Sequence, residues 1–264
     1  MKNISDRKRI VVKVGTSTLT HRTGMLNIRR VEQLVKTLAD IQNSGHEVIL
    51  VSSGAIGLGM GKLGLRERPK DTPGKQACAA VGQCELMYLY DNLFAEYSIT
   101  VAQMLLTKYI LLEDRRKNVE NAMERLIAHG AIPIINENDT VAIDELELEV
   151  GENDSLAATV AAIAKADLLI IMSDIDGLYD KDPHTYDDAR LIPVVHEITD
   201  DIRALAGGAG TKLGTGGMIT KLNAVEIAYD SDIDVVLMNG QHPKTLYDLF
   251  DGKTVGTFFC KKPD

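Results

Sequence analysis

The sequence predicts an α/β fold: a three-layer αβα sandwich in which a central, mostly parallel sheet lies between two layers of helices. Short β-branched runs such as RIVVKV and EVILV alternate along the chain with longer stretches of helical periodicity. No repeat, linker or low-complexity tract interrupts this alternation. Such alternation is typical of parallel sheets that are covered on both faces. We therefore expect residues 1–264 to form a single domain.

The first half of the chain is expected to contain four strands. The first, RIVVKV, ends at a Gly-Thr-Ser turn, and a helix with regularly spaced apolar residues follows until Gly45. The second, EVILV, leads into a glycine-rich loop, SSGAIGLGMG, where backbone could approach a ligand. A long helix is predicted over residues 73–97, a strand over 99–104, an amphipathic helix over 113–130 and a strand over 131–135.

The second half is expected to begin with a hairpin between residues 136 and 154. A helix over 155–166, a strand over 167–174, a polar loop and a shorter hairpin around LIPVV should follow. A glycine-rich loop over 207–217 then leads into a helix over 218–230 and a strand over 234–240. The chain should finish with a short helix and an edge strand near GTFF.

Composition restricts the partners. A net charge of −9 argues against nucleic acid or a membrane surface, because phosphate-rich surfaces are bound by basic faces. No apolar stretch approaches the roughly 20 residues of a membrane span, and Lys13 interrupts the first apolar run too early for a signal peptide. Three cysteines without metal-ligand spacing suit a reducing compartment, so a cytoplasmic location is expected.

Two clusters of Asn and acidic residues, NEND at 136–139 and GEND at 151–154, are the most informative feature of the chain. Each stands at the end of a predicted core element, where open α/β sheets place ligand sites. Such side chains can bind a small zwitterion, with Asp139 accepting from an ammonium and Asn153 offering its amide to a carboxylate. Asn and Asp also form Asx-turns and helix N-caps, and this alternative stays open for either cluster alone.

Two lysines suggest phosphoryl transfer. This reaction depends on positioning the reactants and on neutralising the negative charge of the transferred phosphoryl group. Lys13 ends the first strand, and Lys221 lies one turn into the helix after GTGGM. Either could instead be an ordinary lysine that reaches solvent. Neither G-x-G-x-x-G nor a Walker A motif is present. Phosphoryl transfer requires a nucleotide as donor. Ser173 and Asp174 end a central strand, so they should point toward this nucleotide.

Over residues 10 to about 240 the chain resembles the amino acid kinase family. The motifs VVKVGTSTLT, VSSGAIGLG, KQACAAVGQ, INENDTVA, GENDSLAA, SDIDGLYDKDP and GTGGMITKLNAV occur in the order typical of that family. The NEND and GEND pair resembles the motifs of those family members that phosphorylate glutamate. The resemblance implies the amino acid kinase fold, with an N-terminal part that mainly binds the acceptor and a C-terminal part that mainly binds ATP.

The implied reaction is ATP-dependent phosphorylation of the side-chain carboxylate of L-glutamate to L-glutamyl 5-phosphate, the first step of proline biosynthesis, with Mg²⁺. The resemblance assigns Lys13 and Lys221 to the transferring phosphoryl group and Asp154 to holding both ammonium groups. It implies glutamate binding at Ser53, Asp139 and Asn153, and no protein ligand is assigned to the metal. ATP binding is implied at Lys13, Ser173, Asp174, Thr215, Gly216, Gly217, Met218, Ile219, Thr220 and Lys221.

The resemblance also implies feedback inhibition by proline, and we expect a homo-oligomer. Many members carry a C-terminal PUA domain, which is not expected here because the sequence stops at Asp264. Glu152 stands where some members have Asp. Two other classes stay open: a sensing module with the same fold but no turnover, and a dinucleotide oxidoreductase suggested by the glycine-rich loop alone.

Overall fold

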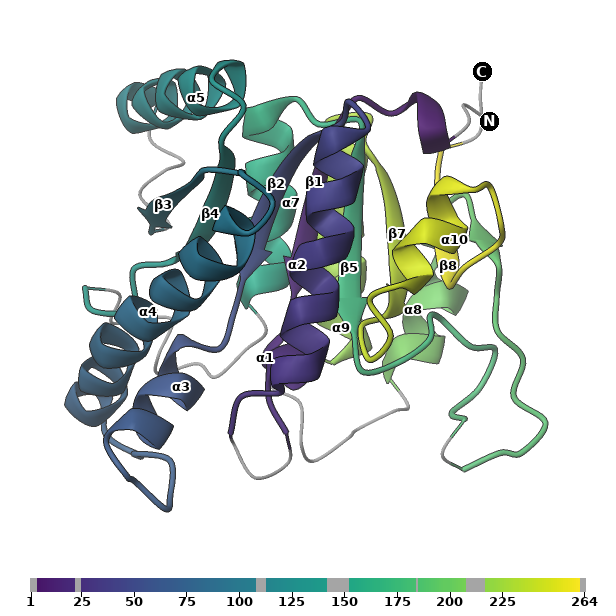
Figure 1. Cartoon of the computed structure of the whole chain (residues 1–264). Coiled ribbons are helices and arrows are strands. Elements are labelled where there is room, and N and C mark those ends of the chain that lie inside the picture. Colours follow the sequence, from purple (N-terminus) through teal and green to yellow (C-terminus); the bar gives the residue numbers. More distant parts are fainter. Residues whose placement is uncertain are drawn as a thin grey trace.

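A computed structural model describes residues 4–21, 25–107, 113–141, 152–183, 185–207 and 217–261. Its strands are β1 (Arg9–Val14), β2 (Glu47–Ser52), β3 (Val101–Leu106), β4 (Ile132–Glu137), β5 (Leu168–Ser173), β6 (Val194–Val195), β7 (Asp234–Asn239) and β8 (Thr257–Phe259). They form one eight-stranded sheet in the order β3-β4-β2-β1-β5-β7-β8-β6. Neighbouring strands pair in parallel except β7 with β8, so the predicted mostly parallel sheet is confirmed (Figure 1).

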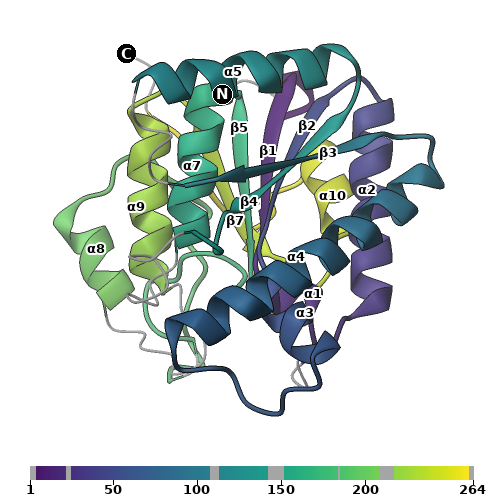
Figure 2. The ribbon, with the colours of Figure 1, turned by 90° about the vertical axis from the view of Figure 1, so that its left-hand side faces the viewer.

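Helices cover both faces of this sheet, as predicted (Figure 2). Their bounds are η1 (Ile4–Asp6), α1 (Thr16–Leu19), α2 (Ile28–Asn43), α3 (Ala55–Lys62), α4 (Thr72–Ala95), α5 (Glu113–Ala128), α7 (Glu152–Ala164), α8 (Asp200–Gly207), α9 (Met218–Tyr229) and α10 (Thr245–Phe250). One apolar cluster joins α2, α4 and α10 to the sheet, and a second joins α5, α7 and α9 to its other face.

The alternation of side chains along β1 decides where Lys13 points. Ile10, Val12 and Val14 belong to the cluster under α2, whereas Val11 belongs to the cluster under α7 and α9. Successive side chains of a strand point to opposite faces. Lys13 therefore shares the direction of Val11 and enters the layer that α7 and α9 build.

The glycine-rich segment after β2 differs from the prediction, because Ala55–Lys62 forms helix α3 and not an open loop. Its glycines allow α3 and α4 to approach closely. A Cβ built at Gly59 would lie 1.8 Å from the carbonyl oxygen of Cys78, and one built at Gly82 would lie 1.7 Å from that of Ala55. Most of the glycine pattern therefore serves helix packing, although Gly54 also caps α3 with a φ of +101°.

The C-terminal strands also differ from the prediction. β8 lies between β7 and β6, so the segment near GTFF is not the edge strand. The other edge of β8 pairs in parallel with Val194–Val195. The short hairpin predicted around LIPVV is present as one antiparallel bridge between Tyr179 and Leu191. The third strand begins at Val101, two residues later than predicted. The hairpin expected between residues 136 and 154 falls mainly on 142–151, which lie outside the described residues.

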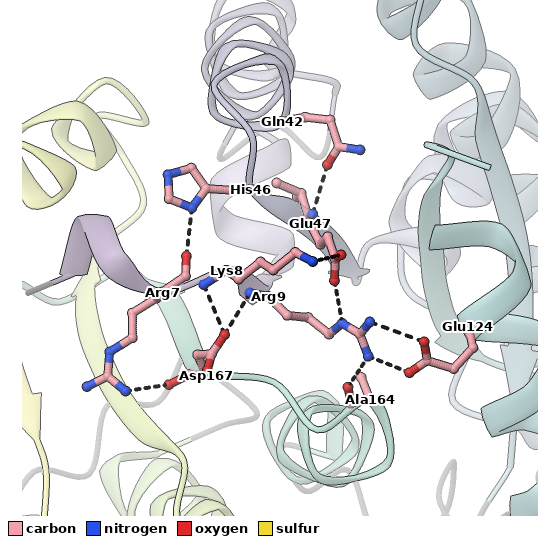
Figure 3. A network of polar contacts seen from close by, with 10 residues as sticks. Arg7, Lys8, Arg9, Gln42, His46, Glu47, Glu124, Ala164 and Asp167 are labelled. Carbon is pink, nitrogen blue, oxygen red and sulfur yellow. Dashed lines mark hydrogen bonds and ion pairs between the residues drawn. The ribbon is translucent and has the colours of Figure 1, made fainter. Parts of the chain in front are cut away.

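Charged side chains hold the amino ends of the strands together (Figure 3). The Nε of Arg9 donates to Glu47 at 2.8 Å, and its Nη1 donates to Glu124 at 2.5 Å. The carboxylate of Asp167 accepts from the backbone N–H of Arg9 at 2.9 Å, and its carbonyl accepts from Arg7 at 3.4 Å. These contacts join β1, β2, α5 and the start of β5, so the basic N-terminal segment is used inside the fold.

Cys78 and Cys260 are buried, Cys84 is exposed, and all three are free thiols. Of the helices in the described ranges, none combines the length and the apolar character that a membrane crossing requires.

Gly82→Ala should lower the free energy of unfolding by about 2 kcal/mol or more, because the added methyl group overlaps the backbone of α3. Gly61→Ala in α3 is a matched control, since its nearest neighbour would be Met25 Sδ at 3.9 Å. The control should be neutral or stabilising by up to about 1 kcal/mol, because alanine favours helix. Urea unfolding measures both, and equal stability of the two variants would contradict the close packing.

Candidate active site

The carboxyl ends of the parallel strands meet at one edge of the sheet, opposite the charged network of Figure 3. β1 occupies the centre of this edge. β2, β4 and β3 follow on one side of β1, and β5, β7, β8 and β6 follow on the other. A change of direction in strand order at the carboxyl ends is where open α/β sheets bind ligands.

Three charged side chains meet beside the end of β1. Lys13 Nζ lies 2.7 Å from Asp154 Oδ1, and Lys221 Nζ lies 3.3 Å from Asp154 Oδ2. The residues come from β1, α7 and α9, and their exposed fractions are only 8%, 1% and 5%. Two ammonium groups against one carboxylate leave an excess of one positive charge. Because buried charges require partners, this trio fits an anionic group.

The carboxylate of Asp154 is held ionised by its neighbours. Burial raises the pKa of Asp154, but the charges of Lys13 and Lys221 outweigh burial and hold this pKa below its ordinary value. Thr220 Oγ1 adds a hydrogen bond of 3.4 Å to the same carboxylate. Asp154 can therefore orient both ammonium groups at neutral pH.

The alternative in which both lysines reach solvent is wrong. Both are buried, and the ammonium of Lys13 lies beside the backbone at the end of β1, where a Cβ built at Gly15 would be 3.6 Å from Nζ. The capping alternative is wrong for Asn153 and Asp154, because their side chains contact residues far away in the sequence. The structure thus brings together all three residues predicted to be catalytic.

A second group of polar side chains lies at the ends of β2 and β4. Asn153 Nδ2 donates to Ser53 Oγ at 2.6 Å and to Asn136 Oδ1 at 3.3 Å. Asn136 Nδ2 donates to Gln83 Oε1 at 2.9 Å. We call these four residues the amide relay. Ser53 and Asn153, both of which the resemblance implies in glutamate binding, are in contact here, and the group also contains Asn136 and Gln83, for which no role was expected.

Both added residues carried a signal in the sequence. Asn136 belongs to the NEND cluster. Gln83 interrupts the buried stripe of α4, four residues after Ala79 and three before Leu86, both of which are buried. A polar side chain on an apolar helix face needs a hydrogen-bond partner, which here is Asn136.

The rest of the NEND cluster forms the turn after β4. Asn138 Oδ1 accepts from Thr140 Oγ1 at 2.5 Å, and the Asn138 carbonyl accepts from the backbone N–H of Val141 at 3.0 Å. Asn138 thus follows the turn alternative. Asp139 stands in this turn, three residues after Asn136 and at the same edge of the sheet.

Lys13 is on β1 itself, and the other described residues predicted to bind ATP lie on the β5 and β7 side of β1. Ser173 ends β5 and donates to the exposed Asp174 at 3.1 Å. Gly217 caps α9, whose first turn contains Met218, Ile219, Thr220 and Lys221, while Thr215 and Gly216 lie outside the described residues.

Asn239 was not predicted as a site residue from the sequence. It ends β7 and pairs with Ser173 on the neighbouring strand β5. Its Nδ2 donates to Asp176 at 2.6 Å, which joins the loops after β7 and β5. In the described ranges no group of three or more His, Cys, Asp and Glu side chains could hold a metal ion.

Comparisons with known proteins agree with this architecture. Residues 8–239 match the amino acid kinase family. Glutamate 5-kinase of Clostridium perfringens is 52% identical over 264 residues, which cover 99% of this chain and 98% of that protein. Glutamate 5-kinase of Clostridium tetani is 53% identical over 257 residues, covering 97% and 96%. The structure of UMP kinase from Bacillus anthracis aligns with a TM-score of 0.67 over 97% of both chains, at 15% identity, which is a likeness of fold.

Asp154→Asn should lower the free energy of unfolding by about 3–5 kcal/mol at neutral pH, because two buried ammonium groups lose the charge that neutralises them. The pKa of Asp154 is lowered in the folded state, so its contribution is fully present above the unfolded pKa of about 3.9 and is lost as the pH falls through the folded pKa. Urea unfolding should show a constant deficit between about pH 5 and 7 that shrinks below about pH 4.

The control is Asp187→Asn, at an exposed position, which should change stability by less than about 0.5 kcal/mol. A deficit of Asp154→Asn that stays the same in acid would show that packing, and not charge, stabilises this site.

Proposed function

The chain belongs to the amino acid kinase family, and we propose that it transfers the γ-phosphoryl group of ATP to the side-chain carboxylate of L-glutamate. The product is L-glutamyl 5-phosphate, in the first step of proline biosynthesis. Relatives about half identical over nearly the whole chain carry the name of this reaction. The observation that carries the proposal is the buried trio in which Asp154 holds the ammonium groups of Lys13 and Lys221 together beside the amide relay.

The chemistry needs these charges more than it needs a base. The acceptor carboxylate is ionised at pH 7 and is already a nucleophile, so no general base is required. Phosphoryl transfer is accelerated mainly by positioning the reactants and by stabilising charge on the transferred group. Lys13 and Lys221 would contact the phosphoryl oxygens from two sides, and Asp154 would fix the separation of their ammonium groups.

The two sides of β1 divide the substrates in this proposal. Ser53, Asn153 and Asp139 on the β2 and β4 side would bind glutamate. The loops after β5 and β7 and the segment 215–221 would bind ATP, with Ser173 and Asp174 at the end of β5. Residues 1–264 would then form one kinase domain whose N-terminal part is mainly for the acceptor and whose C-terminal part is mainly for ATP.

Several further properties are part of the proposal. Mg²⁺ would be held mainly by ATP oxygens, because this ion retains few protein ligands when it accompanies phosphates. Proline shares the α-carboxylate and the ammonium of glutamate and would compete for the amide relay as a feedback inhibitor. The protein would act in the cytoplasm as a homo-oligomer. It would bind neither nucleic acid nor a membrane, because its net charge of −9 repels polyanions.

The two competing classes are weaker. The dinucleotide reading depended on an open glycine-rich loop, but that segment is α3, whose glycines pack on α4. A sensing module would tolerate the loss of one phosphoryl lysine, yet both lysines are present and paired with Asp154.

ADP release should be fastest with L-glutamate in a panel that also contains aspartate, acetylglutamate, carbamate and UMP. A coupled ADP-release assay with ATP and Mg²⁺ measures the kcat/KM of each acceptor. Faster turnover of any other acceptor would reject glutamate as the substrate, and no ADP release with any of them would favour the sensing module.

Lys13→Ala and Lys221→Ala should each lower kcat about 100-fold or more, because their contacts strengthen in the transition state. Lys8→Ala is the matched control: Lys8 precedes the same strand, at the opposite edge of the sheet, and its side chain is 73% exposed. The control should keep the kcat of the wild type. If kcat survives in both site variants, the phosphoryl group is transferred elsewhere.

A further inference from the structure

Gln83 occupies a position that packing alone does not explain. Its side chain is buried on α4, with an exposed fraction of 8%, and its Oε1 accepts from Asn136 Nδ2 at 2.9 Å. Its Nε2 is also buried and has no hydrogen-bond partner among the described residues. A buried donor without a partner costs stability that an apolar side chain of the same size would avoid. Such a departure from good packing is expected at functional positions.

The amide relay has a definite direction. Gln83 presents its oxygen to Asn136, so Asn136 must present its nitrogen to Gln83 and its oxygen to Asn153. Asn153 then directs its Nδ2 toward these neighbours, and its two amide protons are donated to Asn136 Oδ1 and Ser53 Oγ. Each orientation follows from the one before it, beginning at Gln83.

This direction determines which atoms remain for a ligand. Ser53 Oγ already accepts a hydrogen bond, so its hydroxyl proton is left to donate. Both amide protons of Asn153 are used, so its Oδ1 is left to accept. A carboxylate needs donors and an ammonium needs acceptors. Ser53 therefore suits a carboxylate of the substrate, and Asn153 suits the ammonium, the reverse of the role expected for Asn153 from the sequence.

We propose that Gln83 is a positioning residue for the acceptor substrate: through Asn136 and Asn153 it fixes Ser53 as a donor and Asn153 as an acceptor. This inference rests on the proposed function, since it concerns how the amino acid acceptor is bound. Gln83 acts through its neighbours and not by contact with the phosphoryl group. Its loss should change the affinity for glutamate and leave the use of ATP intact.

Gln83→Met tests the proposal, because it keeps the length of the side chain and removes the acceptor. The KM for glutamate should rise about tenfold, as expected for one neutral hydrogen bond, while the KM for ATP stays within about twofold. Gln83→Glu should restore most of the glutamate affinity, because burial favours a protonated carboxyl that keeps the carbonyl acceptor. The midpoint of thermal unfolding should change little in either variant.

Gln103→Met, at an exposed position of the edge strand β3, is the control with the same chemical change and should leave both KM values unchanged. If Gln83→Met does not fold, Gln83→Asn withdraws the amide by one methylene and should raise the KM for glutamate similarly. Wild-type KM values in Gln83→Met or Gln83→Asn, or a Gln83→Glu variant as impaired as Gln83→Met, would overturn the assignment. A wild-type protein without glutamate-dependent ADP release would instead overturn the proposed function and this inference with it.

Discussion

The neutralisation of two buried lysines by Asp154 is the interaction on which the site depends. Lys13 comes from the first strand, Asp154 from the middle of the chain and Lys221 from near its end, so the trio requires the whole sheet and both covering helices to be in place. Without the carboxylate, two ammonium groups would stand together in a site that excludes water, which burial makes very unfavourable. Two ammonium groups and one carboxylate give the trio a net charge of +1, which favours an anionic ligand and so couples folding to binding.

The two edges of the sheet use charge in opposite ways. At the amino ends, arginines and carboxylates are matched closely, and backbone groups are included in the same network (Figure 3). At the carboxyl ends two lysines share one carboxylate, beside the amide relay that ends at Ser53. The charge pairs at the amino ends contribute to stability, whereas the polar groups at the carboxyl ends contribute to ligand recognition. One parallel sheet separates these two roles in space.

Strand and helix alternation was enough to predict the three layers and to place Lys13 and Lys221 near the ligand edge, because parallel sheets bring their carboxyl ends to one edge. The place of Asp154 between the two lysines was implied only by the resemblance to the amino acid kinase family. Three features were missed for physical reasons. The glycines of α3 have the same spacing whether they face a phosphate or a neighbouring helix, and only the packing of α4 decides between these. The pairing of Val194–Val195 was missed because these residues pair with β8, far away in the sequence, and not with their neighbours in a hairpin. The role of Gln83 depends on a hydrogen bond to a residue 53 positions away.

Gly82 and Gln83 are consecutive in α4 but have different partners: Gly82 lies against the backbone of α3, and Gln83 against Asn136 at the end of β4. At Gly59 and Gly82 no side chain separates the backbones of α3 and α4, so the two helices are in direct backbone contact there. A displacement of α3 would therefore bear directly on the turn of α4 that carries Gln83. Directed evolution for altered acceptor affinity should consequently enrich substitutions on the outer surface of α3, where no contact with a bound acceptor is required.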